Sequence, residues 1–170
     1  MLVGEAGETD AARRLMAHSP LDATGLPGPS LIVYMAGACM FRTPRYRQIG
    51  GYEPLFFIGG EETLVSVDVL AGGVAIVYAE EPIVRHHPSP LRDSALRRRM
   101  LARNATWVAC MRLSRREAWC ATWAAVGVMR REDTFVRDAL ALFAALPWAL
   151  TRRRLIPREA LCQSSMQCLG

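Results

Sequence analysis

Three glycine pairs limit how long any regular element in the first half of this chain can be. Glycine adopts left-handed backbone conformations that other residues avoid, so each pair favours the end of an element. The pairs are Gly50-Gly51, Gly59-Gly60 and Gly72-Gly73. They predict short elements between them: a helix over Thr43–Ile49 with Pro44 in its first turn, an aromatic loop or short strand over Tyr52–Ile58, and a helix over Glu61–Ala71.

Apolar and β-branched runs on either side of these glycines predict strands. The runs are Leu31–Phe41, Val74–Tyr78 and Ile83–His87. We expect them in or beside one sheet, with the helix Glu61–Ala71 packed nearby and an apolar edge of the sheet exposed. The first part of the chain is therefore predicted to be α/β.

The second part of the chain is predicted to be helical. Helical patterns cover Ser94–Leu113, Arg116–Met129 and Thr134–Arg153, and Pro147 should kink or split the last of them. The longest uncharged runs, Ala118–Met129 and Ala139–Leu150, have twelve residues each. A membrane-spanning helix needs about 20, so these runs are too short to cross a bilayer, although they could lie on its surface. We divide the chain into residues 1–92, a helical extension 93–160 and a tail 161–170.

Charge is divided between the two halves of the chain. Residues 1–84 carry five arginines and ten acids, whereas residues 85–158 carry sixteen arginines and five acids. A basic surface of this kind attracts phosphates of nucleotides, nucleic acids or anionic lipids, although solvated helix faces explain many of these arginines. A basic helical binding module for an anionic membrane or nucleic acid is therefore an alternative function. Recognition-helix, RNP and zinc-knuckle signatures are absent, so nucleic acid is not the expected partner.

The cysteines and the start of the sequence favour one cellular compartment. Five cysteines form no CxxC pair, and Met1 is not followed by a signal-peptide pattern. We expect reduced thiols and a cytoplasmic location, including the inner face of the membrane.

Motifs between Gly37 and Pro88 resemble the second half of the catalytic domain of family 2 glycosyltransferases, which have the GT-A fold. The matching pieces in order are Gly37–Arg42, Ile49–Tyr52, Phe56-Phe57, Gly59–Glu62, the strand through Tyr78 and His86–Ser89. Fainter similarity extends over Arg97–Trp107 and Pro147–Pro157. The resemblance implies a partial GT-A fold and inverting transfer of a sugar from a nucleotide-sugar donor. The acceptor would be a hydroxyl of a glycan or a lipid-linked molecule, as in the synthesis of cell-envelope polysaccharides.

The resemblance implies roles for the acidic pair. Glu62 matches the general base that takes the proton from the acceptor hydroxyl, and Glu61 matches a neighbour that positions the acceptor or the base. The family usually has Asp where this chain has Glu62. Acids in a first helical turn are also favoured by the helix dipole alone, which is the simpler structural explanation. Asp68 lies two turns after Glu61 on the same helix face, and we expect it to be a buried ion-pair partner near the site. Gly59 and Gly60 are also expected near the site.

His86 and His87 fall where the family carries a histidine that contacts the metal or the diphosphate. Adjacent strand residues point to opposite faces, so at most one of them should face the site, and surface histidines before a proline turn are the alternative. The implied cofactor is Mn²⁺ or Mg²⁺. The DxD motif that holds the metal diphosphate in the family is absent from the chain. We therefore expect a truncated enzyme that is inactive alone, or a non-catalytic remnant of the family.

Overall fold

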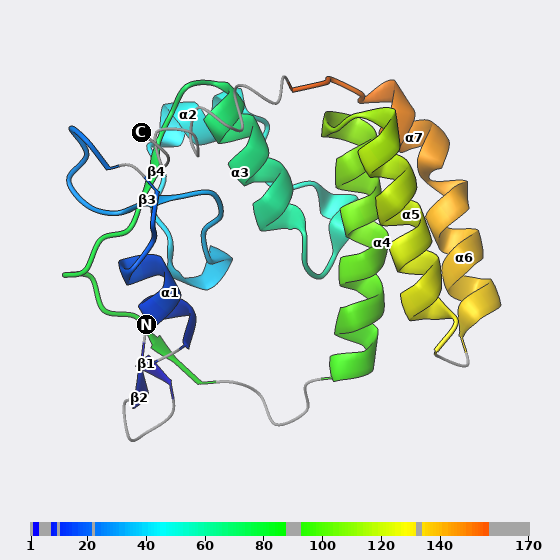
Figure 1. Ribbon diagram of the computed structural model, residues 1–170, viewed down its shortest axis with the longest axis horizontal. Helices are drawn as coiled ribbons and strands as arrows, with labels where there is room; N and C mark the ends of the chain where they lie inside the picture. The colour runs from blue at the N-terminus through cyan, green and yellow to red at the C-terminus, as the bar shows by residue number, and fades with distance from the viewer. Residues whose placement is uncertain are drawn as a thin grey trace. The chain divides into compact units, whose positions relative to one another are not determined.

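The computed structural model describes residues 2–3, 8–9, 11–21, 23–87, 93–131 and 134–156 (Figure 1). These residues form two compact units. The first unit holds the described residues up to Gly51 together with residues 65–87, and the second holds Tyr52–Leu64 and Asp93–Ile156. Residues 52–64, which the sequence division put with the first part, thus pack with the helices.

Four helices lie side by side in the second unit (Figure 1). They are α4 (Ser94–Arg112), α5 (Arg115–Met129), α6 (Phe135–Ala144) and α7 (Leu146–Thr151). The predicted helical stretches are confirmed, and the third is split at Ala145, so that Pro147 occupies the first turn of α7, where its missing N–H costs nothing.

Side chains at the helix starts explain where α4 and α5 begin. The Asp93 carboxylate accepts a hydrogen bond from the Leu96 N–H at 2.8 Å. Ser114 and Glu117 form a reciprocal capping box at the start of α5. Such caps satisfy N–H groups that have no partner within the helix, which favours these starting points.

Three aromatic rings organise the core of the second unit. Phe56 is fully buried, and its ring centroid lies 6.0 Å from that of Trp107 and 6.5 Å from that of Trp148. Met111 and Ala149 are buried in the same cluster. The loop before α3 is therefore anchored to α4 and α7 by one buried ring.

A buried ion pair joins α4 to α6. Arg99 Nη1 lies 2.9 Å from Asp138 Oδ2, and the Thr134 hydroxyl donates to the same oxygen at 2.8 Å. Burial alone would raise the pKa of Asp138, but the hydrogen bonds from Thr134 and Arg99 and the charge of Arg99 outweigh burial and lower this pKa below its ordinary value.

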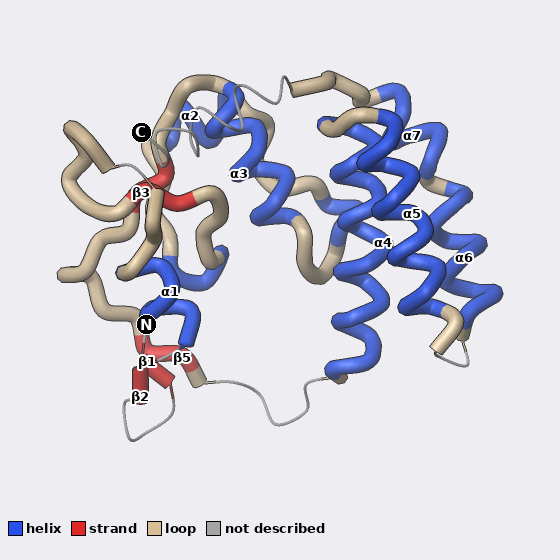
Figure 2. The backbone as a smooth tube through the Cα atoms, viewed as in Figure 1, coloured by secondary structure: helices blue, strands red, loops and turns tan. Residues whose placement is uncertain are grey.

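The first unit is mostly loop with short elements (Figure 2). Its helices are α1 (Ala11–Ala17), α2 (Thr43–Gln48) and the later turns of α3 (Glu61–Ala71), which begins and ends at the predicted residues. Gly50, Gly51 and Gly73 have positive φ, as expected where α2 and α3 end. The strands are β1 (Leu2–Val3), β2 (Glu8–Thr9), β3 (Ser30–Leu31), β4 (Ile76–Val77) and β5 (Arg85–His86).

The prediction that the three strands lie in or beside one sheet holds for the first two, but the third belongs to another sheet. β3 pairs antiparallel with β4, whereas β5 pairs parallel with β1 in a different sheet. The predicted strand Leu31–Phe41 is also wrong, because pairing ends at Leu31 and residues Ala36–Ala38 form a 3₁₀ turn. Small residues such as those in this turn have weak strand preference, and an apolar run stays extended only where a neighbouring strand pairs with it.

Apolar side chains remain exposed in the first unit. The exposed fraction is 56% for Ile32, 85% for Met40 and 63% for Ile83. None of these three residues lies within a strand, so the expectation of an exposed apolar sheet edge stays a prediction. No helix in the described part of the chain is long and apolar enough to cross a membrane.

Candidate functional site

The loop that leads into the acidic pair has an unusual backbone. Phe57 has φ 61° and ψ −62°, and the Ile58 N–H donates to the Phe56 carbonyl at 2.7 Å. Together these define a γ-turn of the rare, strained hand. The Phe57 side chain is 74% exposed. A side chain held outward by a strained turn is a feature of functional loops more than of structural ones.

Asn104 of α4 holds this loop in place. Its side-chain amide donates to the carbonyls of Phe56, Ile58 and Gly59 at 2.8, 3.1 and 2.5 Å. Its Oδ1 accepts from Arg103 Nε at 3.1 Å, and the Asn104 side chain is fully buried. One side chain thus supplies donors to the carbonyls of Ile58 and Gly59 and a further donor to that of Phe56, which also accepts from the Ile58 N–H and from Arg103 Nη2. These hydrogen bonds fix the path of the loop.

The two glycines before α3 allow the loop to approach α4. Gly59 and Gly60 have φ of 77° and 88°. A Cβ on Gly59 would lie 2.5 Å from Leu101 Cδ2, and a Cβ on Gly60 would lie 3.0 Å from Asn104 Cβ. Both the left-handed backbone and the close approach therefore require glycine, and the predicted glycine break has a structural reason.

Glu61 and Glu62 begin α3 and are both partly buried. Burial raises the pKa of Glu61, and the charge of Glu62 adds to this effect, whereas backbone amides at Glu61 and Gly59 and the charge of Arg97 act in the opposite direction. Glu61 Oε2 is buried and has no hydrogen-bond partner among the described residues. Such an oxygen is costly to bury and is ready to accept a hydrogen bond from a ligand.

The other predicted site residues lie in the first unit. Asp68 is buried with 8% of its surface exposed, in the turns of α3 that belong to that unit. His86, the last residue of β5, is partly buried, and His87, which follows the strand, is exposed. The structure thus brings Glu61, Glu62, Gly59 and Gly60 together within the second unit. Convergence of the histidines with the acidic pair stays a prediction.

The part of the chain that the structure describes contains no group of three or more His, Cys, Asp or Glu side chains suited to hold a metal ion. His86 ends β5 and His87 follows it, and two imidazoles alone do not make a complete ligand set for Mn²⁺ or Mg²⁺, which prefer oxygen ligands. The metal role of the histidines stays a prediction.

Sequence reasoning missed two residues of this site, Asn104 and Arg97. Asn104 lies on the same helix face as the buried residues Met100, Trp107, Val108 and Met111. A polar residue on the core-facing side of a helix needs hydrogen-bond partners, and this position in the apolar pattern could have identified Asn104. Arg97 is exposed in the first turn of α4, and nothing in the sequence distinguishes it from its neighbours Arg98 and Arg99.

Comparisons with known proteins add no relatives. The chain matches no family model, no curated protein and no solved structure.

Proposed function

We propose that this chain carries the acceptor side of an inverting glycosyltransferase and that the pair Glu61-Glu62 is its proton-accepting site. The observation that supports this function is the partly buried carboxylate pair on a turn that Asn104 and two glycines hold rigidly. Transfer to a hydroxyl needs a carboxylate that is fixed before the acceptor arrives, because only a positioned base lowers the barrier efficiently.

The two carboxylates have different roles in this proposal. Glu62 accepts the proton of the acceptor hydroxyl as that oxygen attacks the anomeric carbon of the donor. Glu61 positions the acceptor, because its Oε2 is buried without a partner among the described residues and can accept a hydrogen bond from a second hydroxyl. The exposed Phe57 ring, on the loop directly before the pair, offers an apolar surface for a sugar ring.

Arg97 contributes charge to the same site. Its guanidinium acts on the pKa of Glu61 in the direction that keeps the carboxylate ionised. An arginine in this place also suits a phosphate of a lipid-linked acceptor.

The proposal is tested on the protein as its cell makes it, recovered through a tag added to its chromosomal gene. The preparation is incubated with a panel of radiolabelled nucleotide sugars and with lipid and glycan extracts as acceptors. Glu62→Gln preserves the shape of the side chain but removes the proton acceptor, so we expect kcat to fall by about 100-fold or more with donor affinity nearly unchanged. Near-normal kcat in this variant would refute the assignment of Glu62.

Two further variants separate the proposed roles. Glu61→Gln should raise KM for the acceptor more than it lowers kcat, because it weakens positioning. Glu80→Gln, an exposed glutamate in the first unit, is the matched control and should leave both constants unchanged. If Glu61→Gln instead removes turnover and Glu62→Gln does not, the roles are reversed.

The isolated 170-residue chain should transfer no sugar and bind UDP or GDP weakly.

A further inference from the structure

An outward face of α5 is apolar and unusually aromatic. Trp119 and Trp123 are 63% and 52% exposed, and their rings pack edge to face with centroids 5.5 Å apart. Cys120, Ala124 and Gly127 are also exposed and share this face at helical spacing. No charged residue interrupts α5 between Ala118 and Met129.

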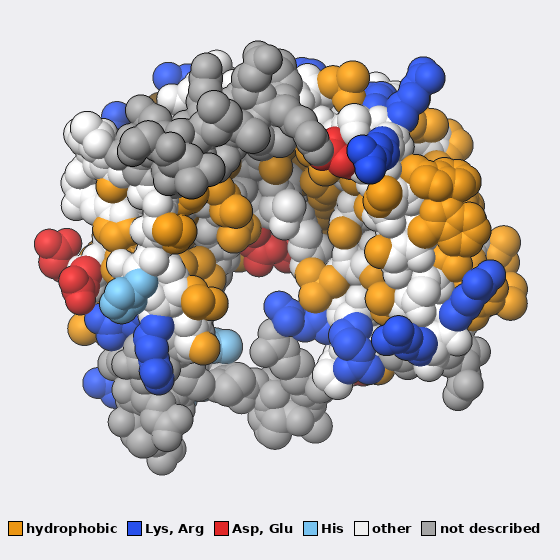
Figure 3. Space-filling model, viewed as in Figure 1, with side chains coloured by type: hydrophobic (Ala, Val, Ile, Leu, Met, Phe, Trp, Pro, Cys, Tyr) orange, Lys and Arg blue, Asp and Glu red, His pale blue; other side chains and the backbone are white. Residues whose placement is uncertain are grey.

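Exposed apolar side chains continue on the helices that follow. Val136, Leu140 and Phe143 of α6 are 68%, 66% and 49% exposed, and Leu150 of α7 is 52% exposed. Figure 3 shows hydrophobic side chains gathered over the helical unit, with arginines beside them. Single exposed apolar residues are ordinary on a protein surface, but a concentration of this kind marks an interaction surface.

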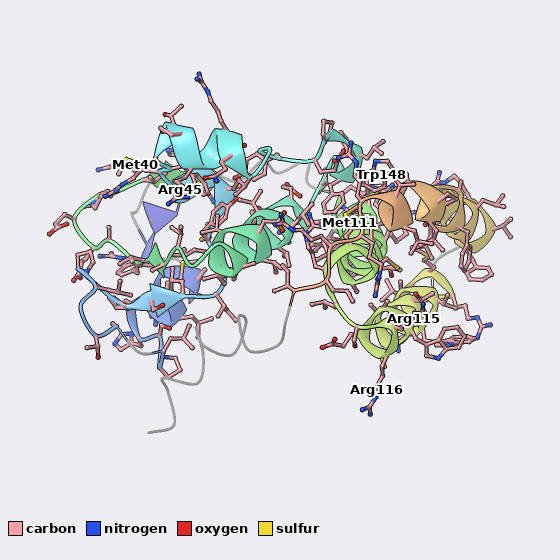
Figure 4. The ribbon with its side chains drawn as sticks, turned by 90° about the horizontal axis from the view of Figure 1, so that it is seen from above. Met40, Arg45, Met111, Arg115, Arg116 and Trp148 are labelled. Atoms are coloured by element: carbon pink, nitrogen blue, oxygen red, sulfur yellow. The ribbon has the colours of Figure 1, made fainter. Side chains whose placement is uncertain are left out.

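Arginines flank this apolar face at both ends of α5. Arg115 and Arg116 lie in its first turn, and Arg130 and Arg131 follow its last residue. All four are exposed, and Figure 4 shows Arg116 projecting away from the helices. The unit that presents the aromatic face, residues 52–64 and 93–156, carries thirteen arginines and eight acids, and its net charge is therefore +5.

We propose that the outward face of α5, together with the exposed side chains of α6 and α7, docks the protein on an anionic lipid surface. Tryptophan prefers the boundary between hydrocarbon and headgroups, where its ring is apolar and its N–H stays hydrated. Arginines at both ends of the helix reach headgroup phosphates while the uncharged stretch between them enters the boundary. α5 lies in the plane of the membrane.

The distribution of charge favours an anionic lipid surface over two other partners, a second copy of the chain and nucleic acid. A second copy of the chain would bring its own flanking arginines against these four, and like charges at an interface oppose association. Nucleic acid is bound by arginines interleaved with aromatic residues along one groove. Here twelve consecutive residues without charge, Ala118–Met129, separate the two arginine pairs. Only an anionic lipid surface uses both features of the face at once.

Co-sedimentation of the full chain with vesicles tests the proposal. We expect binding to vesicles of phosphatidylcholine mixed with phosphatidylglycerol, weaker binding to phosphatidylcholine alone, and loss of binding as salt rises. Trp119→Ser with Trp123→Ser should lower the partition coefficient by about tenfold or more, since two large apolar side chains no longer enter the boundary. Arg115→Glu with Arg116→Glu should lower it by at least about fivefold per arginine on the anionic vesicles.

Matched variants of the first unit are the controls. Met40→Ser removes an apolar side chain that is 85% exposed, and Arg45→Glu with Arg47→Glu reverses two exposed arginines of α2. These variants should bind vesicles nearly as well as the unmodified chain. Equal losses in the control and α5 variants would overturn the proposal, because binding would then follow overall charge and hydrophobicity.

Cys120 offers a direct readout of insertion. A polarity-sensitive dye on Cys120, with Cys39, Cys162 and Cys168 replaced by Ser, should increase in fluorescence on anionic vesicles. The same dye on Cys39, in a chain with the other three replaced, should not. No vesicle binding, combined with dimerisation that the tryptophan variants abolish, would overturn the proposal in favour of a second copy. Binding to duplex DNA in place of vesicles would also overturn it.

Membrane docking does not depend on the acidic pair. Glu62→Gln should retain vesicle binding whatever its effect on sugar transfer, and the α5 variants should retain transfer to a water-soluble acceptor. The two proposals can therefore fail separately.

Discussion

Replacing Asn104 with aspartate removes the two N–H donors that hold the loop before α3 and puts a carboxylate in their place. In the native chain the amide of Asn104 donates to three carbonyls, those of Phe56, Ile58 and Gly59. Three acceptors share two N–H groups, so at least one N–H bridges two carbonyls. In the Asn104→Asp variant, every one of these carbonyls faces another oxygen acceptor.

The size of the effect follows from burial. Leaving the carbonyls of Ile58 and Gly59 without this donor costs about 1–3 kcal/mol each, whereas the Phe56 carbonyl keeps the Ile58 N–H and Arg103 Nη2 as donors. The new carboxylate is itself buried, but Arg103 Nε already donates to this position at 3.1 Å and pairs with it, so the charge adds less than an unpaired buried charge, which costs about 3–5 kcal/mol. We expect a total loss of about 4 kcal/mol, a large share of the 5–15 kcal/mol that stabilises a typical domain.

The same variant should show a characteristic pH dependence. Burial and the three carbonyls raise the pKa of the introduced carboxyl above that of the unfolded chain, against the opposing charge of Arg103. Its protonated form carries one O–H donor and no charge, so the variant is less destabilised in acid. The stability difference from the native chain is smallest below the unfolded pKa of about 4 and grows as pH rises through the higher folded pKa.

Urea unfolding monitored by helical circular dichroism measures both effects. The matched control is Gln48→Glu, which makes the same amide-to-acid change at an exposed position and should shift stability by less than about 0.5 kcal/mol. A urea midpoint for Asn104→Asp equal to that of the control, or a loss of stability that does not depend on pH, would refute the role of Asn104 in holding the loop.

Three other perturbations test neighbouring features. Glu61→Gln should stabilise the chain at neutral pH but not in acid, because burial raises the pKa of Glu61 and this carboxylate becomes unfavourable as pH rises; equal effects at both pH values in urea melts would contradict this. Asp138→Ala should cost about 3–5 kcal/mol of stability because it leaves Arg99 buried without its ion-pair partner, whereas the N-cap control Asp93→Ala should cost only about 1 kcal/mol. The native chain should lose stability as pH falls through the lowered pKa of Asp138. Gly60→Ala should cost more than Gly73→Ala by about 1 kcal/mol, because both have positive φ but only Gly60 approaches Asn104; equal costs in the same melts would rule out the close approach.

Elements whose ends are set by local chemistry could be predicted from the sequence. The bounds of α3 follow from a glycine pair on each side, and the split before Pro147 follows from its missing N–H. Strands could not be predicted as well, because pairing is decided by distant segments. β5 pairs with β1, more than eighty residues earlier, and nothing near Arg85 encodes that partner.

The acidic pair was located from the sequence, but the difference between its two members was not. That difference depends on which carboxylate oxygen the loop and α4 cover, and the residue that fixes the loop is Asn104, more than forty residues later. Glu61 and Glu62 belong to the same unit as Asn104 and Arg97, whereas Asp68, His86 and His87 belong to the other. Besides burial, the groups that act on the pKa of Glu61 are Glu62, Arg97 and the backbone amides of Glu61 and Gly59, all in the second unit. A substitution at Asn104 should consequently change the titration of Glu61, followed by NMR of the labelled side chain, whereas His86→Ala should leave it unchanged. A shift caused by His86→Ala would mean that the first unit also shapes the acidic pair, and the site could then no longer be assigned to the helical unit alone.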